Sequence, residues 1–304
     1  FFNAVKPTLL KETEAITKNM RQRGGGILAI ELLDSTKNMA NYYQLHVRFE
    51  TADAMGANFI NSCLEQLAQT LQNEAANYPH FSKTEKQIEV VMSILSNYVP
   101  GSRVKAWVSC PIAELGDDGD VLAKKFVQAV EIAHHNAYRA VTHNKGIMNG
   151  VDALAIATGN DFRAVEAGIH AYAAKDGNYR GLSKARIKKD VFWFELELPL
   201  SVGTVGGLTK LHPMVQWSHQ LLQNPNAKEL MQIMAVSGLA QNFAALRSLV
   251  TTGIQKGHMK MHLLNILNQM GATQHEKEAM IKHFTTNVVS FNAVEQALAA
   301  WRKN

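Results

Sequence analysis

The spacing of apolar residues changes along this chain of 304 residues, and the change limits the folds open to it. Before residue 111 the apolar runs are mostly short and strand-like, and glycine or polar turns bound them. From about residue 213 onward apolar residues recur mainly at helical spacing, with a break near 271–274. Separate strand-rich and helix-rich stretches predict an α+β fold.

Four segments before residue 111 predict strands, and they occur as two pairs with a helix between the pairs. The predicted strands cover 27–33, 42–50, 87–98 and 102–110, and the helix covers 57–75. This order predicts a small four-stranded domain. Elsewhere the pattern predicts a helix over 4–22 that ends at three consecutive glycines, a long amphipathic helix over 121–141 and a half-exposed strand over 192–200.

The stretch from His143 to His170 carries reactive residue types around one short apolar run. We interpret residues 152–158 as a strand and the polar, glycine-containing segments beside it as loops, where folds commonly expose functional side chains. Lys145 and Asp161 are the candidate site residues. A loop lysine can equally be solvated, and Asp161 can simply cap the helix that follows it. The residue types alone leave both interpretations open.

Two further glycine turns each join a strand to a helical region. Residues 53–58 read Asp-Ala-Met-Gly-Ala-Asn, and residues 203–207 read Gly-Thr-Val-Gly-Gly. Asp53 can cap the helix after it, but the free N–H groups at a helix start also suit a pyrophosphate. Neither turn has the GxGxxG spacing of a Rossmann fold, so capping and nucleotide binding both stay open.

Composition narrows the functional classes further. Hydrophobic residues make up 46% of the chain and charged residues 19%, which indicates a globular protein. The sequence has no run of about 18 apolar residues, so no membrane helix is predicted. The basic cluster at 184–189 is interpreted as a solvated loop, and no nucleic-acid partner is predicted. His258 and His262 lack a third ligand, so no metal site is predicted, and the two cysteines fit a reducing cytoplasm.

Several motifs occur here in one order between about residues 24 and 261, and together they resemble 3-hydroxy-3-methylglutaryl-CoA reductases, most closely the soluble bacterial class. The motifs are DAMGANFIN, HNKGIMNG, ATGNDFRAVEAG, GTVGG, LAQNFAALRSL and GIQKGHM. The resemblance implies reduction of a thioester to the alcohol mevalonate with release of CoA, or the reverse oxidation, using two equivalents of NAD(P)H. The residue at Ala29 leaves the choice between NADH and NADPH open.

The resemblance also implies roles for individual residues. Lys145 matches the cation that stabilises the developing oxyanion, and Asp161 matches the aspartate that hydrogen-bonds this lysine. His258 matches the acid that protonates the departing thiolate, at the start of a C-terminal flap. The implied substrate-binding residues are Arg139, Asn149, Gln241 and Leu249. The implied cofactor-binding residues are Asp53, Met55, Gly56, Asn58 and Asn97.

A domain order follows from the same resemblance. Residues 1–23 are expected as a helix of the large domain, 24–115 as a small ferredoxin-like NAD(P)-binding domain, 116–255 as the large substrate-binding domain and 256–304 as the flap region. A cytoplasmic homodimer or larger homo-oligomer with shared active sites is expected, with small-molecule ligands and no membrane partner.

One departure from the family pattern bears on activity. In the family a catalytic glutamate, followed closely by proline and serine, precedes the small domain, and no such segment occurs here. We expect an upstream segment to supply it, and the alternative is an inactive CoA- or nucleotide-binding fragment or homologue. The assigned roles also make a geometric prediction: the chain doubles back at Gly146–Gly150 so that Lys145 and Asp161 reach hydrogen-bonding distance. A separation above about 8 Å would contradict that pairing.

Overall fold

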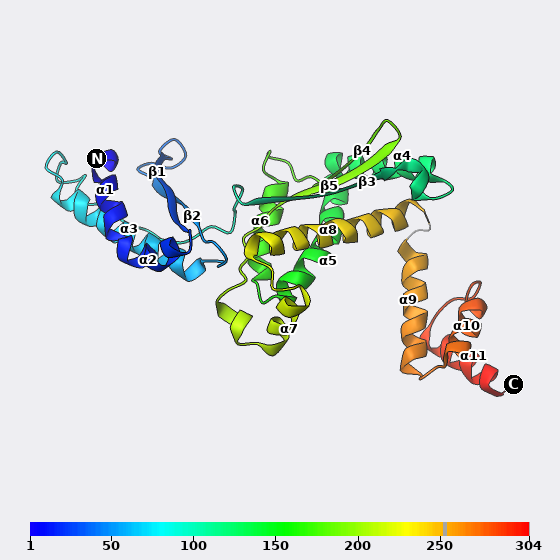
Figure 1. Cartoon of the computed structure of the whole chain (residues 1–304). Coiled ribbons are helices and arrows are strands. Elements are labelled where there is room, and N and C mark those ends of the chain that lie inside the picture. Colours follow the sequence, from blue (N-terminus) through cyan, green and yellow to red (C-terminus); the bar gives the residue numbers. More distant parts are fainter. Residues whose placement is uncertain (252–253, 304) are drawn as a thin grey trace.

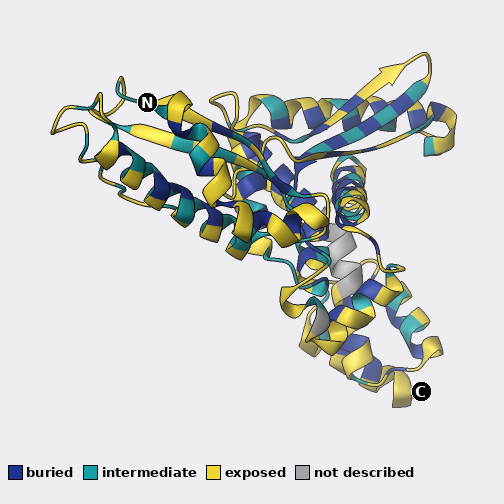
Figure 2. Cartoon of the chain, turned by 60° about the vertical axis from the view of Figure 1, so that its left-hand side comes forward, coloured by how far each residue is buried: buried dark blue, intermediate teal, exposed yellow. Residues whose placement is uncertain are grey.

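Helices and short strands gather around separate hydrophobic cores in a computed structural model of the chain (Figure 1). The structure describes the backbone of residues 1–251 and 254–303, and the side chains of these residues except 210 and 254–261. Figure 2 shows buried residues concentrated where the elements pack on one another. The α+β class predicted from the apolar pattern is confirmed, although the strand arrangement differs from the prediction.

The first core joins the N-terminal helices to a two-stranded sheet. Here α1 (Phe2–Glu12), α2 (Glu14–Gln22) and α3 (Ala57–Asn77) pack with β1 (Gly26–Asp34) and β2 (Tyr43–Glu50), which pair antiparallel. Val5 and Leu9 of α1 are buried against Ile30 of β1 and Leu67 of α3. Buried side chains of residues 1–23 therefore complete this N-terminal core, and the expected assignment of these residues to the large domain stays a prediction.

The prediction of a four-stranded domain is wrong, because the predicted strands do not share one sheet in the structure. The segment predicted as the third strand has no ladder partner in the structure, and its Val91 and Met92 side chains are 78% and 74% exposed. The fourth predicted strand forms as β3 (Arg103–Pro111), but it pairs with β5 (Val191–Pro199). Val104 and Ala106 lie opposite Leu198 and Leu196, so burying this apolar face places β3 in the central sheet.

The central sheet has the order β3-β5-β4, and helices cover it. The remaining elements are β4 (Ser183–Lys188), η1 (Ile112–Leu115), α4 (Gly119–His135), α5 (Ala137–Ala157), α6 (Phe162–Ala173), η2 (Gly207–Lys210), α7 (Pro213–Leu221) and α8 (Ala227–Val250). Phe126 of α4 packs edge-on against Phe192 and Phe194 of β5, with ring centroids 5.2 and 5.1 Å apart. Among the described residues, α8 is the one helix long and apolar enough to cross a membrane, but it contacts α5 and β3 and buries Leu230 and Met234 in this core.

Two predicted elements of the central region form differently. The helix predicted over 121–141 breaks at Asn136, whose extended backbone ends α4 and whose side chain accepts the Arg139 N–H to begin α5. The strand predicted over 152–158 is instead the end of α5. Val151 and Ala155, four residues apart, are both fully buried, and this helical spacing outweighs the short apolar run that suggested a strand.

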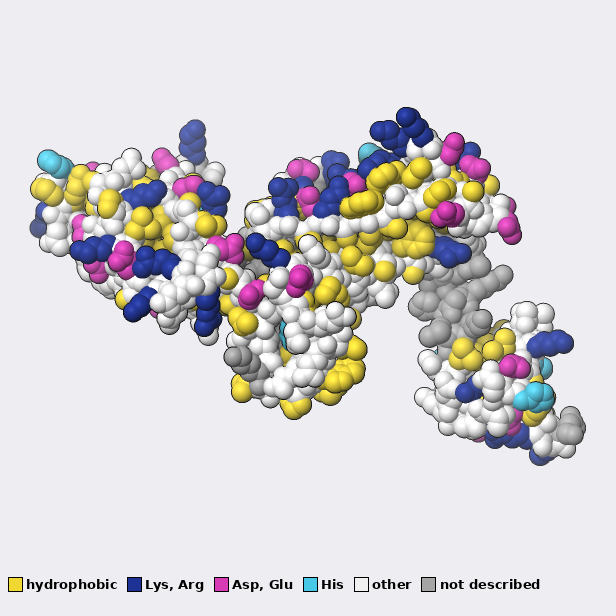
Figure 3. Space-filling model, viewed as in Figure 1, with side chains coloured by type: hydrophobic (Ala, Val, Ile, Leu, Met, Phe, Trp, Pro, Cys, Tyr) yellow, Lys and Arg dark blue, Asp and Glu magenta, His cyan; other side chains and the backbone are white. Residues whose placement is uncertain are grey.

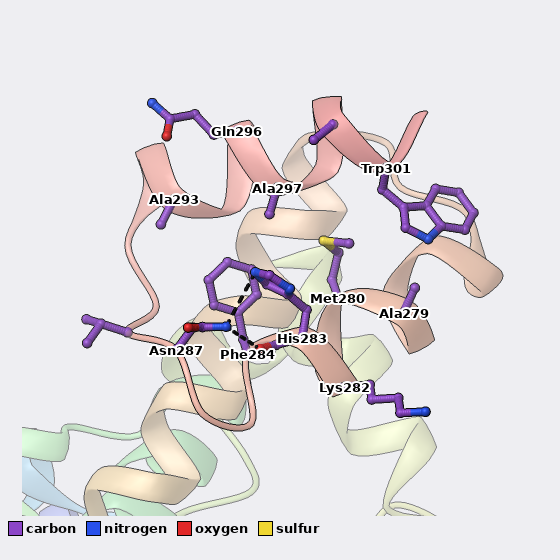
Figure 4. Close-up of a pocket in the computed structure, with 12 residues that line it drawn as sticks. Ala279, Met280, Lys282, His283, Phe284, Asn287, Ala293, Gln296, Ala297 and Trp301 are labelled. Atoms are coloured by element: carbon purple, nitrogen blue, oxygen red, sulfur yellow. Dashed lines mark hydrogen bonds between the residues drawn. The ribbon is translucent and has the colours of Figure 1, made fainter. Parts of the chain in front are cut away.

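Three helices form the C-terminal core, and they confirm the predicted helical region with a break near 271–274. They are α9 (Ile254–Gln269), α10 (Gln274–His283) and α11 (Phe291–Lys303). Glu276 takes part in a capping box with Thr273 at the start of α10 and also pairs with Arg302 of α11, Nε to Oε1 2.6 Å. A groove of about 920 Å³ between α10 and α11 is lined by Phe284 and Trp301 among others (Figure 4).

Candidate active site

Three glycine-containing loops meet beside α3 and α8, and we call them the three-loop joint: residues 53–56, 157–161 and 203–207. The N–H of Thr204 donates to the carbonyl oxygen of Asp53 at 2.8 Å. The Asp53 carboxylate accepts the N–H of Ala227 at 2.9 Å, so it stabilises the start of α8. Of the two alternatives left open for Asp53, capping of the helix after it is contradicted, because no side chain caps α3 and the carboxylate oxygen facing Ala227 is already engaged.

The middle loop closes the joint through an asparagine that the sequence did not single out. Asn160 accepts the Gly203 N–H through Oδ1 at 2.7 Å and donates to the Gly203 carbonyl through Nδ2 at 3.1 Å. A Cβ at Gly203 would lie 2.5 Å from the Met55 nitrogen, which is closer than packing permits. Glycine is therefore required where these loops touch.

The start of α3 has the geometry of an anion site. Gly56 caps the helix with φ +83°, and a Cβ there would lie 2.5 Å from the Thr51 Cγ2, so only glycine fits. No side chain caps the helix and its first turn has no acidic residue, which leaves N–H groups and the positive helix end for a ligand. Asn58 in that first turn lines a cavity of about 340 Å³ that is also lined by Arg23, the residue after α2.

The remaining predicted cofactor residue lies against α6. A Cβ at Gly168 would come within 2.5 Å of the Asn97 carbonyl oxygen, so the small residue on α6 lets the Asn97 backbone approach closely. The Asn97 side chain is exposed. Within the described residues Asn97 has no hydrogen bond to the three-loop joint, and its role stays a prediction.

Helices α5 and α8 form the second part of the candidate site. They run past each other in opposite directions, because the His143 carbonyl accepts from Asn242 Nδ2 at 3.4 Å while the Gly150 carbonyl accepts from Ser237 Oγ at 3.1 Å. A Cβ at Gly150 would lie 2.5 Å from the Ser237 carbonyl oxygen. The glycine therefore permits this close crossing, which sets how the residues of the two helices face each other.

The predicted substrate residues lie on these two helices. On α5, Lys145 and Asn149 are exposed and lie one turn apart. Arg139 is half-buried, and it lies about 120° round the helix axis from Lys145. On α8, Gln241 is exposed and Leu249 is 42% exposed. Across the part of the chain that the structure describes, the Lys145 ammonium and the Arg139 guanidinium have no hydrogen bond or ion pair.

Asp161 has partners other than the expected lysine. Its carboxylate pairs with Arg163, Nε to Oδ1 3.2 Å, and it accepts the backbone N–H groups of Arg163 and Ala164 at the start of α6. The Arg163 guanidinium, together with these N–H groups, lowers the pKa of Asp161 from its ordinary value. The carboxylate is therefore an anion at neutral pH.

The expected contact between Lys145 and Asp161 within one chain is wrong. The residues from Lys145 to Ala157 form continuous helix. Lys145 therefore lies roughly 18 Å along α5 from Ala157, at about 1.5 Å per residue, and Asp161 follows beyond that end. Gly146 and Gly150 do not turn the chain, because each lies inside the hydrogen-bonded helix. Lys145 is accordingly on a helix face and not in a loop.

Two buried polar features went unnoticed in the sequence. Burial raises the pKa of Asp152 on α5 to about 7, with the neighbouring Glu166 carboxyl on α6 adding to the effect. His143, 1% exposed, donates or accepts at Ser183 Oγ over 2.6 Å. Ser183 and Glu166 are distant in sequence from the residues they contact, so neither contact could be predicted. The one signal in the sequence for the buried His143 was its i, i+4 placement after Arg139.

The predicted acid His258 falls in the range 254–261, whose side chains lie outside the described residues. Among the side chains that are described, no three His, Cys, Asp or Glu residues lie close enough together to hold a metal ion.

Comparisons with known proteins agree on one family. The family model for hydroxymethylglutaryl-coenzyme A reductase matches residues 2–263. Over 288 residues the chain is 35% identical to the reductase of that name from Archaeoglobus fulgidus. This match covers 92% of the chain and 63% of that relative. Over 289 residues the chain is 35% identical to a probable 3-hydroxy-3-methylglutaryl-coenzyme A reductase from Borreliella burgdorferi. This match covers 92% of the chain and 64% of that relative.

A solved structure agrees with the family match. The chain resembles the class II 3-hydroxy-3-methylglutaryl-CoA reductase from Streptococcus pneumoniae, bound to NADPH in open conformations, with a TM-score of 0.74 and 37% identity. This match covers 99% of the chain and 71% of that structure. The chain spans less than two thirds of the length of the two curated relatives.

Proposed function

The chain belongs to the hydroxymethylglutaryl-coenzyme A reductase family, and on that premise we propose that the protein interconverts 3-hydroxy-3-methylglutaryl-CoA and mevalonate plus CoA with two equivalents of NAD(P)H. The observation that carries this proposal is that the half-buried Arg139 guanidinium and the exposed Lys145 ammonium, both on α5, have no ion-pair partner among the described residues. Two cations without carboxylate partners suit a substrate that has a free carboxylate and develops an oxyanion.

The residues of α5 and α8 have distinct roles in this proposal. Arg139 grips the substrate carboxylate with two parallel hydrogen bonds, since a guanidinium matches that geometry. Lys145 stabilises negative charge on the carbonyl oxygen as hydride adds to the carbon, and Asn149 and Gln241 orient the acyl group. His258 protonates the CoA thiolate.

The three-loop joint and the start of α3 suit the nicotinamide cofactor, which supplies the hydride. Gly56 has no room for a Cβ and the α3 N–H groups have no side-chain cap, so the backbone fits closely around a pyrophosphate. Asn58 and Met55 flank this position. Since a relative is described as bound to NADPH, NADPH is a natural first cofactor to test, beside NADH.

We also propose that the working unit is a cytoplasmic homo-oligomer, because one chain separates Lys145 from Asp161. Tyr138 and Ile156 lie on the same stripe of α5 as Lys145, and they are 90% and 59% exposed. Large apolar side chains beside an uncovered cation are typical of a surface that a second subunit covers. The partner copy would then bring its own Asp161 toward Lys145.

A direct spectrophotometric assay of the full-length protein tests the proposal. Mevalonate, CoA and either NAD⁺ or NADP⁺ are supplied, and reduced cofactor is followed by absorbance. We expect turnover that Lys145→Ala lowers by at least about 100-fold, while Lys184→Ala on β4 leaves it unchanged. An absence of turnover with both NAD⁺ and NADP⁺ would refute the proposed enzymatic activity. Retained binding of CoA or nucleotide would then favour an inactive binding homologue.

A further inference from the structure

A closed ring of hydrogen bonds fixes the protonation of a buried histidine between α5, β4 and α8. Ser183 Oγ donates to Asn242 Oδ1 at 2.7 Å, and Asn242 Nδ2 donates to the His143 carbonyl at 3.4 Å. The single hydroxyl proton of Ser183 is thus committed to Asn242. His143 Nε2, 2.6 Å from Ser183 Oγ, must therefore carry the ring proton and donate it to that oxygen.

This tautomer leaves His143 Nδ1 as a bare lone pair. The atom is buried and has no hydrogen-bond partner among the described residues. A buried acceptor without a donor is costly, and such atoms in native proteins usually answer to a ligand, a water or a neighbouring group that moves. The ring of hydrogen bonds thus presents an acceptor in a fixed direction.

Among the residues three or four positions from His143 on α5, Arg139 is the one with a side-chain donor. It precedes His143 by one turn, and side chains on a helix lean toward the N-terminus, so the imidazole leans toward Arg139. The guanidinium is half-buried and unpaired within the described part of the chain. Burial first, and then the charges of Arg139 and His134, lower the pKa of His143 to about 3, so the ring stays neutral beside the cation.

We propose that His143 is a positioning residue: its Nδ1 accepts one N–H of Arg139 when a carboxylate ligand binds, and so aims the opposite edge of the guanidinium at that carboxylate. The inference rests on the proposed function, in which Arg139 grips the substrate carboxylate. No hydrogen bond joins the two side chains in the structure, and the proposal assigns their contact to binding of the carboxylate.

Binding of the dicarboxylate 3-hydroxy-3-methylglutarate tests the coupling in a double-mutant cycle. We expect His143→Phe to weaken binding about tenfold in the wild-type background and to have no further effect in Arg139→Gln. His134→Phe is the matched control, since its Nε2 bonds the Ser183 carbonyl at 2.9 Å, and it should weaken binding equally little in both backgrounds. Additive losses from His143→Phe and Arg139→Gln would overturn the proposal.

Nitrogen NMR of the histidine-labelled protein supplies a readout that a purely structural role would not change. The His143 resonance is assigned by its loss in His143→Phe, and its Nδ1 should report an unprotonated nitrogen that shifts when the dicarboxylate is added. In Arg139→Gln the shift should vanish. A ligand-independent Nδ1 resonance, with dicarboxylate binding still dependent on Arg139, overturns the inference but leaves the proposed function standing. No dicarboxylate binding to the wild type refutes both.

Discussion

Single side chains in this protein are controlled by burial as much as by residue type. Asp152 shows this, since its Oδ1 is buried without a partner among the described residues while Glu166 lies beside it on the next helix. Two carboxyl groups in one partly buried place cannot both ionise cheaply. Sequence predicted neither the pair nor its proton, because α5 and α6 must fold before the two meet.

Asp152→Asn should therefore stabilise the protein at high pH. The folded-state pKa of about 7 lies above the ordinary value of 3.8, so the folded state holds this proton more tightly and stability falls as pH rises from about 4 to about 7. We expect the variant to gain about 1 kcal/mol over wild type at pH 8, after solvent screening, and little at pH 4. Urea unfolding at the two pH values measures this. The exposed Asp176→Asn is the control, and an equal gain at both pH values would contradict the assignment.

At the scale of elements, close helix crossings decide which residues face one another. Gly150 touches the Ser237 backbone where α5 crosses α8, and this contact aligns His143 with Asn242 and brings the predicted substrate residues of both helices onto adjoining surfaces. The glycines of this segment suggested loops from sequence alone. Inside a helix they serve instead as points of close approach.

Gly150→Ala should lower the free energy of unfolding by about 1–3 kcal/mol, because the new Cβ would lie 2.5 Å from the Ser237 carbonyl oxygen. Gly146→Ala on the same helix is the matched control. Its Cβ would meet only Asn242 Nδ2 at 4.0 Å, so it should be neutral or stabilise by up to about 1 kcal/mol. Urea melts of both variants measure the difference. Equal effects would show that helix propensity, and not the crossing, dominates at these glycines.

The C-terminal helices depend on one ionised carboxylate. Arg302 first, and then the N–H of Thr273, lower the pKa of Glu276 from 4.5 to about 2, so its stabilising contribution is present above pH 4.5 and is lost as pH falls toward 2. The protection factors for hydrogen exchange in α10, corrected for the pH dependence of intrinsic exchange, should fall over that range. In Glu276→Gln the exchange should already be faster at pH 7 and should change less on acidification. Glu278→Gln, two residues further along α10, should behave as wild type.

For the whole molecule, uncovered apolar surface is the main unexplained feature. Leu211, Trp217 and Leu221, in and beside α7, are 78%, 54% and 66% exposed, and Figure 3 shows apolar side chains along that edge. Together with the apolar residues beside Lys145, this surface supports the proposal that subunits share active sites.

Mixed subunits distinguish a shared site from one built within a chain. Lys145→Ala and Asp161→Ala proteins, each inactive alone, are unfolded together and refolded as a mixture. If the two residues meet across an interface, half of the dimers are mixed and each has one intact site, so about a quarter of wild-type activity should return. Mixing two Lys145→Ala preparations is the control. No recovery in the mixture would locate both residues in one chain's site and contradict the proposed exchange.

The sequence by itself determined the α+β class, most helices, the individual strands β1, β2, β3 and β5, and the motifs that identify the family. These properties depend on local periodicity and on short runs of residues, which act within one element. It could not assign β3 to its sheet, because Val104 and Ala106 would satisfy any apolar neighbour, and only the face of β5 in the folded chain provides one.

Tertiary structure also decided the form of the candidate site. Whether residues 152–158 are strand or helix depended on Val151 and Ala155 reaching the central core, and that choice placed Lys145 inside α5 and Asp161 beyond its C-terminal end. The engagement of Asp53 with α8, the ring around His143 and the carboxyl pair at Asp152 all join residues far apart in sequence. Contacts of this kind are set by packing, so they appear only when the elements have assembled.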